Sequence, residues 1–562
     1  MEHNIKRINN RDLAEFFLAK SDPAAIIPEL FNIFGFDCMV RTSVNPEKLD
    51  RLIRYFETKE GQNADTLTEI LEVIRKGKFS LEKQETLLLE QIRGHICNHL
   101  TEDLKVEEMA SSLHISYYYL CHFFKQHTGF TPIAYRNRKR IEKAMRLLAE
   151  SDREIPDIAT ECGFDSSSYF TECFSALAGM TPLAFRSTAE KVFFHPFYDL
   201  EDMLLAVRYE TCRFMEQPPV PVSRDCIRTY SVSEPDERFS FLHETAIIEW
   251  KGVLYASWYC CPTVELHGYT PICGRRSYDG GVTWSPLEVL AEDLTGNVLY
   301  CPPVYGVSDG KLYLMMNQMV AADHIHSLDL YVLNEDTDKF EFVWSRPIPF
   351  KLNTNALTLS NGKLMLPGRI GELDQFPNTP AVLISDSGKM DGEWRLVKIA
   401  ENGDLLDGTE LVHPELSVIC QGETLFMFCR NDRRRVPIVY LSHDCGETWT
   451  EAKAHDFPYV RSKVYCGNLS DGRSYLIANV DKFAHKHDRS RLCLYLTEPG
   501  TMQFTKKLTL FDTETAPIGD SCACHYPAAF ESDGKLYVIA TLSGKILRIR
   551  GAVLFVVDLS QI

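Results

Sequence analysis

Polar and aromatic side chains recur at the ends of short apolar segments in the second half of the chain, and their types suit ligand chemistry. Arginine can form a bidentate pair with a carboxylate, and histidine, glutamate and asparagine can bind sugar hydroxyl groups. An aromatic ring can serve as an apolar platform for a sugar ring. The candidate ligand-binding residues are His243, Glu244, Trp258, Asn317, Asn355, Arg369, His413, Arg430 and His525. The alternative is a channel lined by the same residues that holds only water.

These residues converge only if the segments that carry them form a ring. Six segments share an apolar strand, a glycine turn and a second strand, and the turn residues are Gly252, Gly310, Gly362, Gly422, Gly472 and Gly534. The turns are 50 to 62 residues apart, which suits one four-stranded blade. The sequence therefore predicts a six-bladed β-propeller. In each hairpin the first strand starts and the second ends at the same mouth, so the candidate residues face one funnel.

Two octapeptides, "SYDGGVTW" (277–284) and "SHDCGETW" (442–449), share the pattern Ser-x-Asp-x-Gly-x-Thr-Trp. In phase with the repeat, each falls on the turn between the third and fourth strands of its blade. The pattern resembles the Asp box of sialidase-like, or BNR-repeat, propellers, and the resemblance covers residues 221–562. It implies a structural role, in which Ser and Asp close the turn and Trp packs between blades. The residues concerned are Ser277, Asp279, Gly281, Trp284, Ser442, Asp444, Gly446 and Trp449.

The resemblance also implies a possible reaction, because sialidases of this superfamily use a tyrosine nucleophile partnered by a glutamate. Tyr526 in "HYPAAF" and Glu415 in "HPELSV" stand at those positions. Arg430 matches the second of three carboxylate-binding arginines, and Arg491 is the candidate for the third. His243 stands where the first is expected, and the segment "GYTPICG" directly ahead of "RRSYDGG" contains no aspartate. A glycosidase without its proton donor loses a large factor in rate, so we expect no measurable turnover.

A second pattern precedes the propeller and points to DNA. The segments "FFKQHTGFTPIAYR" (123–136) and "CFSALAGMTPLAFR" (173–186) repeat an aromatic residue, Gly, Thr-Pro and a final Arg in phase. Each Gly can end a helix and each Pro can start the next. A helix, a turn and a helix lie ahead of each phrase, which makes two helix-turn-helix units. Over about 100 residues this region resembles the AraC/XylS family of transcription regulators.

The resemblance implies that two recognition helices, Ser116–Gln126 and Ser166–Ala176, enter the major groove of DNA. A basic stripe over residues 136–146 would hold phosphates, which the net charge of -18 makes necessary because an acidic protein repels DNA elsewhere. Glu172 departs from the family pattern and could accept a hydrogen bond from a cytosine amine. The candidate DNA-binding residues are Tyr117, Tyr118, His122, Lys125, Arg136, Arg138, Lys139, Arg140, Ser166, Ser167 and Glu172.

The predicted organisation is therefore a multidomain α and all-β chain. Residues 1–88 form a helical region, 89–188 the double helix-turn-helix domain, 189–220 a linker and 221–562 the propeller. The charged start of the chain and 18 cysteines without a regular framework indicate the cytoplasm, with no membrane segment. We expect no cofactor and no metal site.

These observations predict a transcription regulator that binds promoter DNA and senses a sugar, an acidic one in the first instance, in its propeller funnel. A sialidase-like glycoside hydrolase or lyase with an auxiliary DNA-binding module is one alternative. A propeller that serves as a protein-docking platform is another. The sequence leaves open contact with RNA polymerase, formation of a homodimer, the operator and the sign of regulation.

Overall fold

The computed structural model describes residues 81–562 except 103, 190–191, 193, 195–197, 264, 267, 402–404, 458–460, 481–488, 516–520 and 545–549. The predicted helical region 1–88 therefore lies outside the described residues as far as residue 80. Helix α6 (Leu81–Asn98) runs across the boundary that we placed after residue 88. The chain forms two compact units, one extending to Pro182 without residues 148–151 and the other containing Leu183–Ile562. No helix among the described residues is long and apolar enough to cross a membrane.

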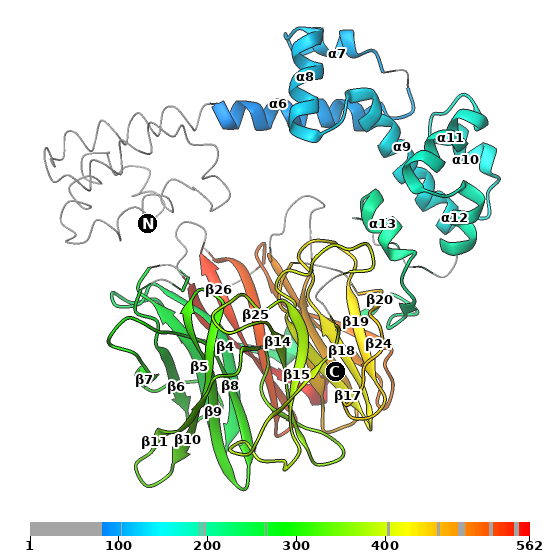
Figure 1. Ribbon diagram of the computed structural model, residues 1–562. Helices are drawn as coiled ribbons and strands as arrows, with labels where there is room; N and C mark the ends of the chain where they lie inside the picture. Colours follow the sequence, from blue (N-terminus) through cyan, green and yellow to red (C-terminus); the bar gives the residue numbers. More distant parts are fainter. Residues whose placement is uncertain are drawn as a thin grey trace, which may run out of the picture. The chain divides into compact units, whose positions relative to one another are not determined.

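The helical region contains the two predicted helix-turn-helix units (Figure 1). Ser116 and Ser166 cap the recognition helices, and each side chain accepts a hydrogen bond from the third backbone N–H of its helix. Gly129 (φ 77°) and Gly179 (φ 69°) end these helices in the left-handed conformation, as the doubled phrase predicts. The helices after α6 are α7 (Val106–Ser112), α8 (Tyr117–Thr128), α9 (Pro132–Glu150), α10 (Ile155–Glu161), α11 (Ser167–Ala178) and α12 (Pro182–Ala189).

Aromatic side chains on the inner faces of α8 and α11 hold each unit together. Leu120, Phe123 and Phe124 of α8 are buried in one cluster with residues of α6 and α7. In the second helix-turn-helix unit, Phe170 and Phe174 of α11 are fully buried, and their ring centroids are 5.7 Å apart. This spacing of three and four residues places the apolar stripe on one side of each helix. The opposite side of each recognition helix is therefore free to contact a partner.

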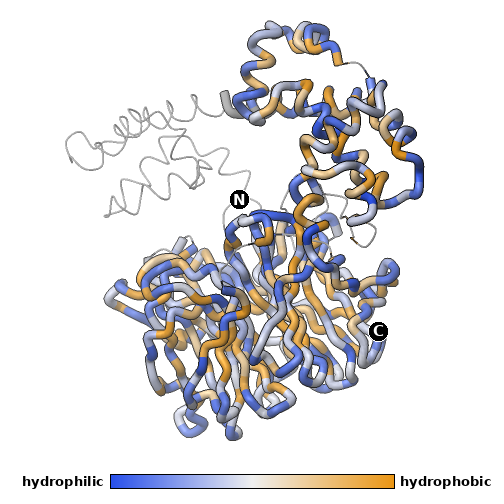
Figure 2. Tube along the Cα trace, turned by 45° about the vertical axis from the view of Figure 1, so that its right-hand side comes forward, coloured by the Kyte–Doolittle hydropathy of each residue, from blue (hydrophilic) through white to orange (hydrophobic). Residues whose placement is uncertain are grey.

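Six four- or five-stranded sheets form the predicted propeller (Figure 1). All six turn glycines adopt a positive φ, between 61° and 86°, as their hairpins require. Figure 2 shows apolar stretches along the strands and hydrophilic turns at their ends. The first three blades are β4 (Phe241–Trp250), β5 (Val253–Cys261), β6 (Ile272–Ser277) and β7 (Glu288–Ala291); β8 (Leu299–Ser308), β9 (Lys311–Ala321), β10 (His324–Asn334) and β11 (Lys339–Arg346); and β12 (Phe350–Leu352), β13 (Leu357–Thr358), β14 (Leu364–Ile370), β15 (Thr379–Ser385) and β16 (Arg395–Lys398). The other three are β17 (Leu416–Gln421), β18 (Thr424–Cys429), β19 (Ile438–Ser442) and β20 (Lys453–His455); β21 (Tyr465–Asn468), β22 (Ser474–Asn479), β23 (Arg491–Thr497) and β24 (Phe504–Asp512); and β25 (Ser521–Ser532), β26 (Lys535–Gly544) and β27 (Arg550–Asp558).

The segment before the first blade supplies the outer strands of blades four, five and six. Strand β1 (Thr211–Cys212) pairs in parallel with β20, and β2 (Val220–Pro221) pairs in parallel with β24. Strand β3 (Ile227–Ser233) pairs antiparallel with β27 and completes the sixth blade. The predicted linker 189–220 therefore is not a free connection, because helix α13 (Leu200–Ala206) and β1 lie within it and β2 begins at its last residue. Two-residue strands carry too little periodicity to be read from sequence.

The two Asp boxes have the same internal geometry. In the first, the Ser277 hydroxyl donates to Asp279 at 2.8 Å, and Gly281 N–H donates to Ser277 Oγ at 2.8 Å. Trp284 Nε1–H donates to the Gly281 carbonyl at 3.1 Å. The second box repeats these bonds at 2.8, 2.8 and 3.1 Å with Ser442, Asp444, Gly446 and Trp449. Hydrogen bonds made by the Ser and Asp side chains thus close the turn of each box.

Substitution of two adjacent glycines in the first box should separate backbone strain from packing. Gly280→Ala and Gly281→Ala both place a side chain at positive φ, 72° and 92°, which costs about 1 kcal/mol. A Cβ at Gly281 would also lie 2.3 Å from Leu554 Cδ2 of the sixth blade, whereas a Cβ at Gly280 meets nothing closer than 3.7 Å. We expect Gly281→Ala to cost about 1–3 kcal/mol more because of overpacking. Thermal unfolding measures the difference, and equal losses would show that the box does not brace the neighbouring blade.

Candidate functional site

An open pocket of about 320 Å³ lies in the propeller, within the range of small-molecule sites. Predicted residues that line it are His243, Glu244, Arg369, His413, Glu415, Arg430 and Tyr526. The structure adds Glu265, Leu266, Ala322, Asp323, Arg489 and Arg550. The lining is thus dominated by charged side chains of both signs, which favours a polar ligand.

Strained backbone turns three of these side chains toward the pocket. Glu244, His413 and Tyr526 have φ values of 49°, 52° and 53°, which non-glycine residues rarely adopt. Glu244 and Tyr526 lie at irregularities in the innermost strands of blades one and six, where the register shifts between His243 and Ala246 and between His525 and Ala528. A bulge of this kind re-aims a side chain relative to the regular alternation of a strand. Strain of this kind is concentrated at functional sites.

Arg430 occupies the centre of the site and is only 6% exposed. Its Nη1 donates to Glu415 Oε2 at 2.7 Å and to Tyr526 Oη at 2.6 Å. Its Nε and Nη2 donate to the two carboxylate oxygens of Asp432, both at 2.7 Å. The bidentate partner of Arg430 is therefore an internal aspartate. Its guanidinium holds Glu415, Tyr526 and Asp432 in place, and it has few N–H groups left to bind a ligand carboxylate.

The protonation states of Tyr526 and Glu415 do not suit a nucleophile and its base. Burial raises the pKa of the Tyr526 phenol, although Arg430 opposes it. Burial also raises the pKa of Glu415, but Arg430, Lys463 and Arg369 outweigh this and lower it to about 2. A carboxylate with so low a pKa is a weak proton acceptor for a phenol whose pKa is raised.

An aspartate that the sequence analysis did not single out, Asp323, lies in the pocket. Asp323 lies between β9 and β10, where its Oδ1 is 3.0 Å from Lys351 Nζ and 3.5 Å from Arg369 Nη2. Burial raises the pKa of Asp323, but Lys351 and Arg369 outweigh burial and lower it. Asp323 is therefore ionised and cannot serve as a proton donor near neutral pH. Sequence reasoning missed it because it considered strand ends at the mouth and not the turns between second and third strands.

Two further arginines form a positive end of the pocket that sequence reasoning also missed. The Arg489 guanidinium lies 5.3 Å from the Tyr526 ring, and its Nη1 is 3.3 Å from His525 Nδ1. Nη2 of Arg550 lies 3.7 Å from Oε2 of Glu265. Its Nη1 has no hydrogen-bond partner among the described residues. Burial lowers the pKa of Arg489, and Arg430 and Arg550 add to this. The candidate Arg491 is wrong, because it pairs with Asp512 at 2.8 Å outside the pocket.

The same cations hold two histidines neutral. Burial, followed by Arg550, His525 and Arg489, keeps the pKa of His243 well below its usual value. Burial, Arg489, Arg550 and Arg430 do the same to His525. The centroids of the two imidazole rings are 5.1 Å apart. His525 lies beside the pocket rather than in its lining. Among the described residues, Glu265 is the carboxylate that faces these arginines, 3.7 Å from Arg550, so this end of the site favours an anionic ligand.

Three predicted ligand-binding residues are structural instead. Trp258 is fully buried in the core between blades, because β5 turns it away from the funnel. Asn317 donates to the Phe350 carbonyl at 2.6 Å and accepts from Leu352 N–H at 2.9 Å. Asn355 accepts from Tyr305 N–H at 2.9 Å and donates to the Ile247 carbonyl at 2.9 Å. Both asparagines join neighbouring blades, so their amide groups are used.

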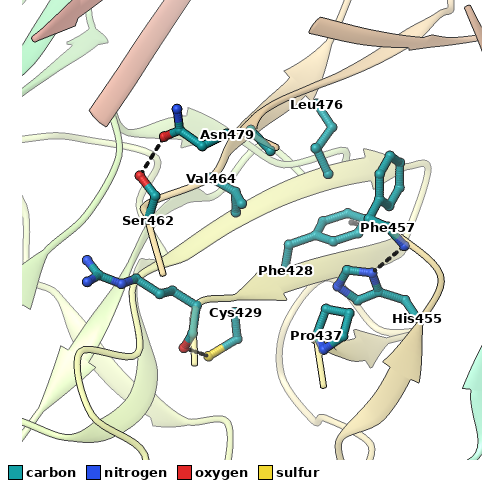
Figure 3. Close-up of a pocket in the computed structure, with 11 residues that line it drawn as sticks. Phe428, Cys429, Pro437, His455, Phe457, Ser462, Val464, Leu476 and Asn479 are labelled. Carbon is teal, nitrogen blue, oxygen red and sulfur yellow. Dashed lines mark hydrogen bonds between the residues drawn. The ribbon is translucent and has the colours of Figure 1, made fainter. Parts of the chain in front are cut away.

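A second, smaller cavity lies between blades four and five, and Arg430 is one of the residues that line it. Figure 3 shows the aromatic and polar side chains around it. Its volume of about 30 Å³ is enough for one water molecule. Phe428 and Phe457 line it, and His455 Nδ1 accepts a hydrogen bond from Phe457 N–H at 3.3 Å. Burial lowers the pKa of His455 to about 3. This cavity is part of the packing of the blades and not a ligand site.

The candidate DNA-binding residues of both recognition helices are exposed. Tyr117 is 48% and Tyr118 78% exposed, and the Tyr118 ring stacks on His122 at 6.1 Å. The remaining exposed candidates are Lys125, Ser166, Ser167 and Glu172. These side chains lie opposite the buried aromatic stripes of α8 and α11, where a recognition helix must face its partner.

The basic stripe on α9 differs from the expectation. Arg140 is 6% exposed, and it donates to the Leu100 carbonyl at 2.6 Å and to the Glu102 carbonyl at 3.0 Å. Arg138 and Lys139 both pair with Glu142, at 3.5 and 2.5 Å. The Arg140 assignment as a phosphate contact is therefore wrong, because its side chain ties α9 to the segment after α6. The sequence pattern shows the charge but not the side of the helix that is buried.

Comparison with known proteins finds one domain family in the helical part of the chain and another in the propeller. Residues 109–188 match the Helix-turn-helix domain family, and residues 270–538 match the BNR repeat-like domain family. The regulatory protein PocR of Salmonella typhimurium is 39% identical over 92 residues, 16% of this chain and 30% of PocR. The activator RhaS of Enterobacter sp. is 32% identical over 123 residues, 22% of this chain and 44% of RhaS. The chain carries an AraC-type helix-turn-helix domain and a BNR repeat-like domain.

The stretches aligned with these relatives are short, and the chain spans less than half the length of either. Among solved structures, the Hadza microbial sialidase Hz136 aligns with a TM-score of 0.47 at 14% identity. That alignment covers 59% of this chain and 69% of the sialidase.

Substitution of Arg140 should destabilise the AraC-type domain without acting through DNA. Arg140→Met leaves the half-buried Leu100 carbonyl without its donor, whereas the Glu102 carbonyl still accepts from Arg136, and we expect a loss of about 1–3 kcal/mol. The control Lys125→Ala removes an exposed side chain and should leave stability unchanged. Thermal melting of the helical circular dichroism signal measures both. If Arg140→Met melts at an unchanged temperature but binds DNA more weakly, Arg140 contacts DNA and its assignment to the interior is wrong.

Neutral, buried His455 should make the propeller less stable in acid. An unfolded histidine takes up a proton below pH 6.5, whereas folded His455 does so only near pH 3. Stability is therefore lost as pH falls through this window, by about 1.4 kcal/mol per pH unit. His455→Leu should reduce the slope of the free energy of unfolding against pH between pH 6 and 4, measured by denaturant unfolding. The exposed control His443→Leu should leave this slope unchanged. An equal slope in all three proteins would contradict the assignment.

Proposed function

We propose that the chain is a DNA-binding transcription regulator whose propeller binds a carbohydrate, specifically an acidic sugar. The observation that carries the ligand class is a pair of half-buried arginines, Arg489 and Arg550, at one end of the pocket. Arg489 and Arg550 lie there without a carboxylate within hydrogen-bond distance among the described residues, beside two histidines kept neutral. A bound carboxylate would pair with these guanidinium groups through charge-assisted hydrogen bonds.

Support for the DNA-binding role comes from the AraC-type domain. Its two recognition helices expose polar and aromatic side chains on the faces opposite their cores. The cations that remain candidates for phosphate contact once Arg140 is assigned to the interior are Lys125, Arg136, Arg138 and Lys139. Promoter DNA is the proposed partner, and binding should weaken as salt is raised.

A glycoside hydrolase or lyase is the second candidate, and Glu244 is the observation in its favour. Burial raises the pKa of Glu244, although Lys351 and Lys463 oppose this, and its Oε2 accepts no hydrogen bond from the described residues. Such a group could donate a proton to a leaving group. The tightly paired Asp323 and the low pKa of Glu415 weigh against a complete catalytic set. The charged lining weighs against the docking platform.

The test is titration calorimetry of the full chain with N-acetylneuraminic acid, glucuronic acid and neutral glucose. We expect binding of at least one acid and not of glucose, and a loss of about tenfold or more for Arg489→Met and Arg550→Met. The matched control is Arg491→Met, which removes an arginine from the adjoining strand outside the pocket. Tyr526→Phe deletes one hydrogen bond and should cost about 1 kcal/mol of affinity.

Release of sugar from a chromogenic sialoside, lost in both Tyr526→Phe and Glu244→Gln, would favour the enzyme instead. Equal affinity for glucose and for the acids, unaffected by either arginine variant, would contradict the ligand class.

A further inference from the structure

The loop that follows Arg430 joins the pocket to the segment that leads to the AraC-type domain. The loop comprises residues 430–436, between β18 and β19, and begins with the arginine that binds Glu415 and Tyr526. Its other boundary, Val436, is fully buried. Both ends of the loop are therefore anchored in blade four.

Within the loop, side chains replace a regular ladder of backbone bonds. Asn431 is fully buried, and its Oδ1 accepts from the backbone N–H groups of Arg433 and Arg434 at 3.1 and 3.2 Å. Its Nδ2 donates to the Val436 carbonyl at 3.3 Å. Asp432 binds the Arg430 guanidinium through both oxygens. The position of the loop backbone is thus tied to the position of the Arg430 guanidinium.

The far side of the loop holds helix α13. Arg435 N–H donates at 3.1 Å to Oδ1 of Asp202, a carboxylate that is 3% exposed. The same side chain closes the capping box of α13, because its Oδ2 accepts from Asp199 N–H at 3.3 Å. One carboxylate therefore both caps the helix and docks it on the loop.

The segment after α13 is attached to the same blade. The Tyr209 hydroxyl accepts from Leu406 N–H at 3.1 Å, and β1 pairs with β20. The backbone N–H groups of Phe214 and Met215 donate to Asp456 at 2.9 and 3.0 Å. Helix α13 thus lies between the AraC-type domain and β1 in the chain, and the loop 430–436 fixes it on the propeller.

We propose that the loop 430–436 transmits occupancy of the pocket to helix α13 through the series Arg430, Asp432, Arg435 and Asp202. This inference rests on the proposed function for its signal, the bound acidic sugar. A ligand that displaces the Arg430 guanidinium moves Asp432 with it, because two hydrogen bonds join them. The loop then shifts Arg435, and the docking and capping of α13 change together.

The coupling can be tested without ligand by hydrogen exchange of the full chain. Asp432→Ala frees the loop from Arg430, and we expect amides of residues 199–207 to exchange about tenfold faster or more. The matched control Asp512→Ala removes an aspartate–arginine pair in the next blade and should not affect them. Exchange in β9, two blades away, reports on global destabilisation and should be unchanged. Unaltered exchange at 199–207 in an otherwise folded Asp432→Ala protein would overturn the proposal.

A second arm uses N-acetylneuraminic acid at a saturating concentration. The sugar should alter exchange at residues 199–207 in the unmodified chain and in Asp199→Ala, which weakens the cap but keeps the loop contact. It should have no such effect in Asp202→Ala, although binding itself persists. An undiminished effect in Asp202→Ala would overturn the proposal. If the sugar does not bind at all but Asp432→Ala still releases α13, the proposed ligand fails and the coupling stands.

Discussion

The requirement that a buried guanidinium be fully paired determines the arrangement of the propeller pocket. Arg430 binds Glu415 at the start of blade four, Tyr526 in blade six and Asp432 in the following loop. Removing one partner of such a buried group exposes the full cost of an unpaired charge, several kcal/mol. The three groups therefore hold their positions together, and any ligand must bind within this arrangement or exchange one partner for itself.

The backbone around the pocket carries a corresponding cost. The left-handed conformations of Glu244, His413 and Tyr526 each disfavour the fold by about 1–3 kcal/mol. Long strands in the same blades, such as β4 and β25, offset that cost through regular pairing on either side of the irregularity. The pocket residues are thus held in place before a ligand arrives, and little ordering is left for binding to supply.

Periodic features of this protein could be predicted from its sequence, and features set by single long-range contacts could not. The doubled Gly-x-Thr-Pro phrase and the six turn glycines act locally, so both domains follow from them. The inward direction of Trp258 and Arg140 depends on which face a neighbour covers, which no local pattern shows. Arg489 and Asp323 escaped because they come from turns and loops, whose conformation depends on partners far away in the chain.

The pairing of β3 with β27 has a consequence for the order of events during synthesis. The outer strand of the sixth blade is made before the first blade, and its partner β27 is made after all the other strands of the propeller. The ring therefore stays open, with the edges of β3 and of each growing blade unpaired, until β27 has left the ribosome. The AraC-type domain precedes all of this and can fold as a unit early. Premature termination within blade six would thus leave a folded DNA-binding domain joined to an open, aggregation-prone sheet.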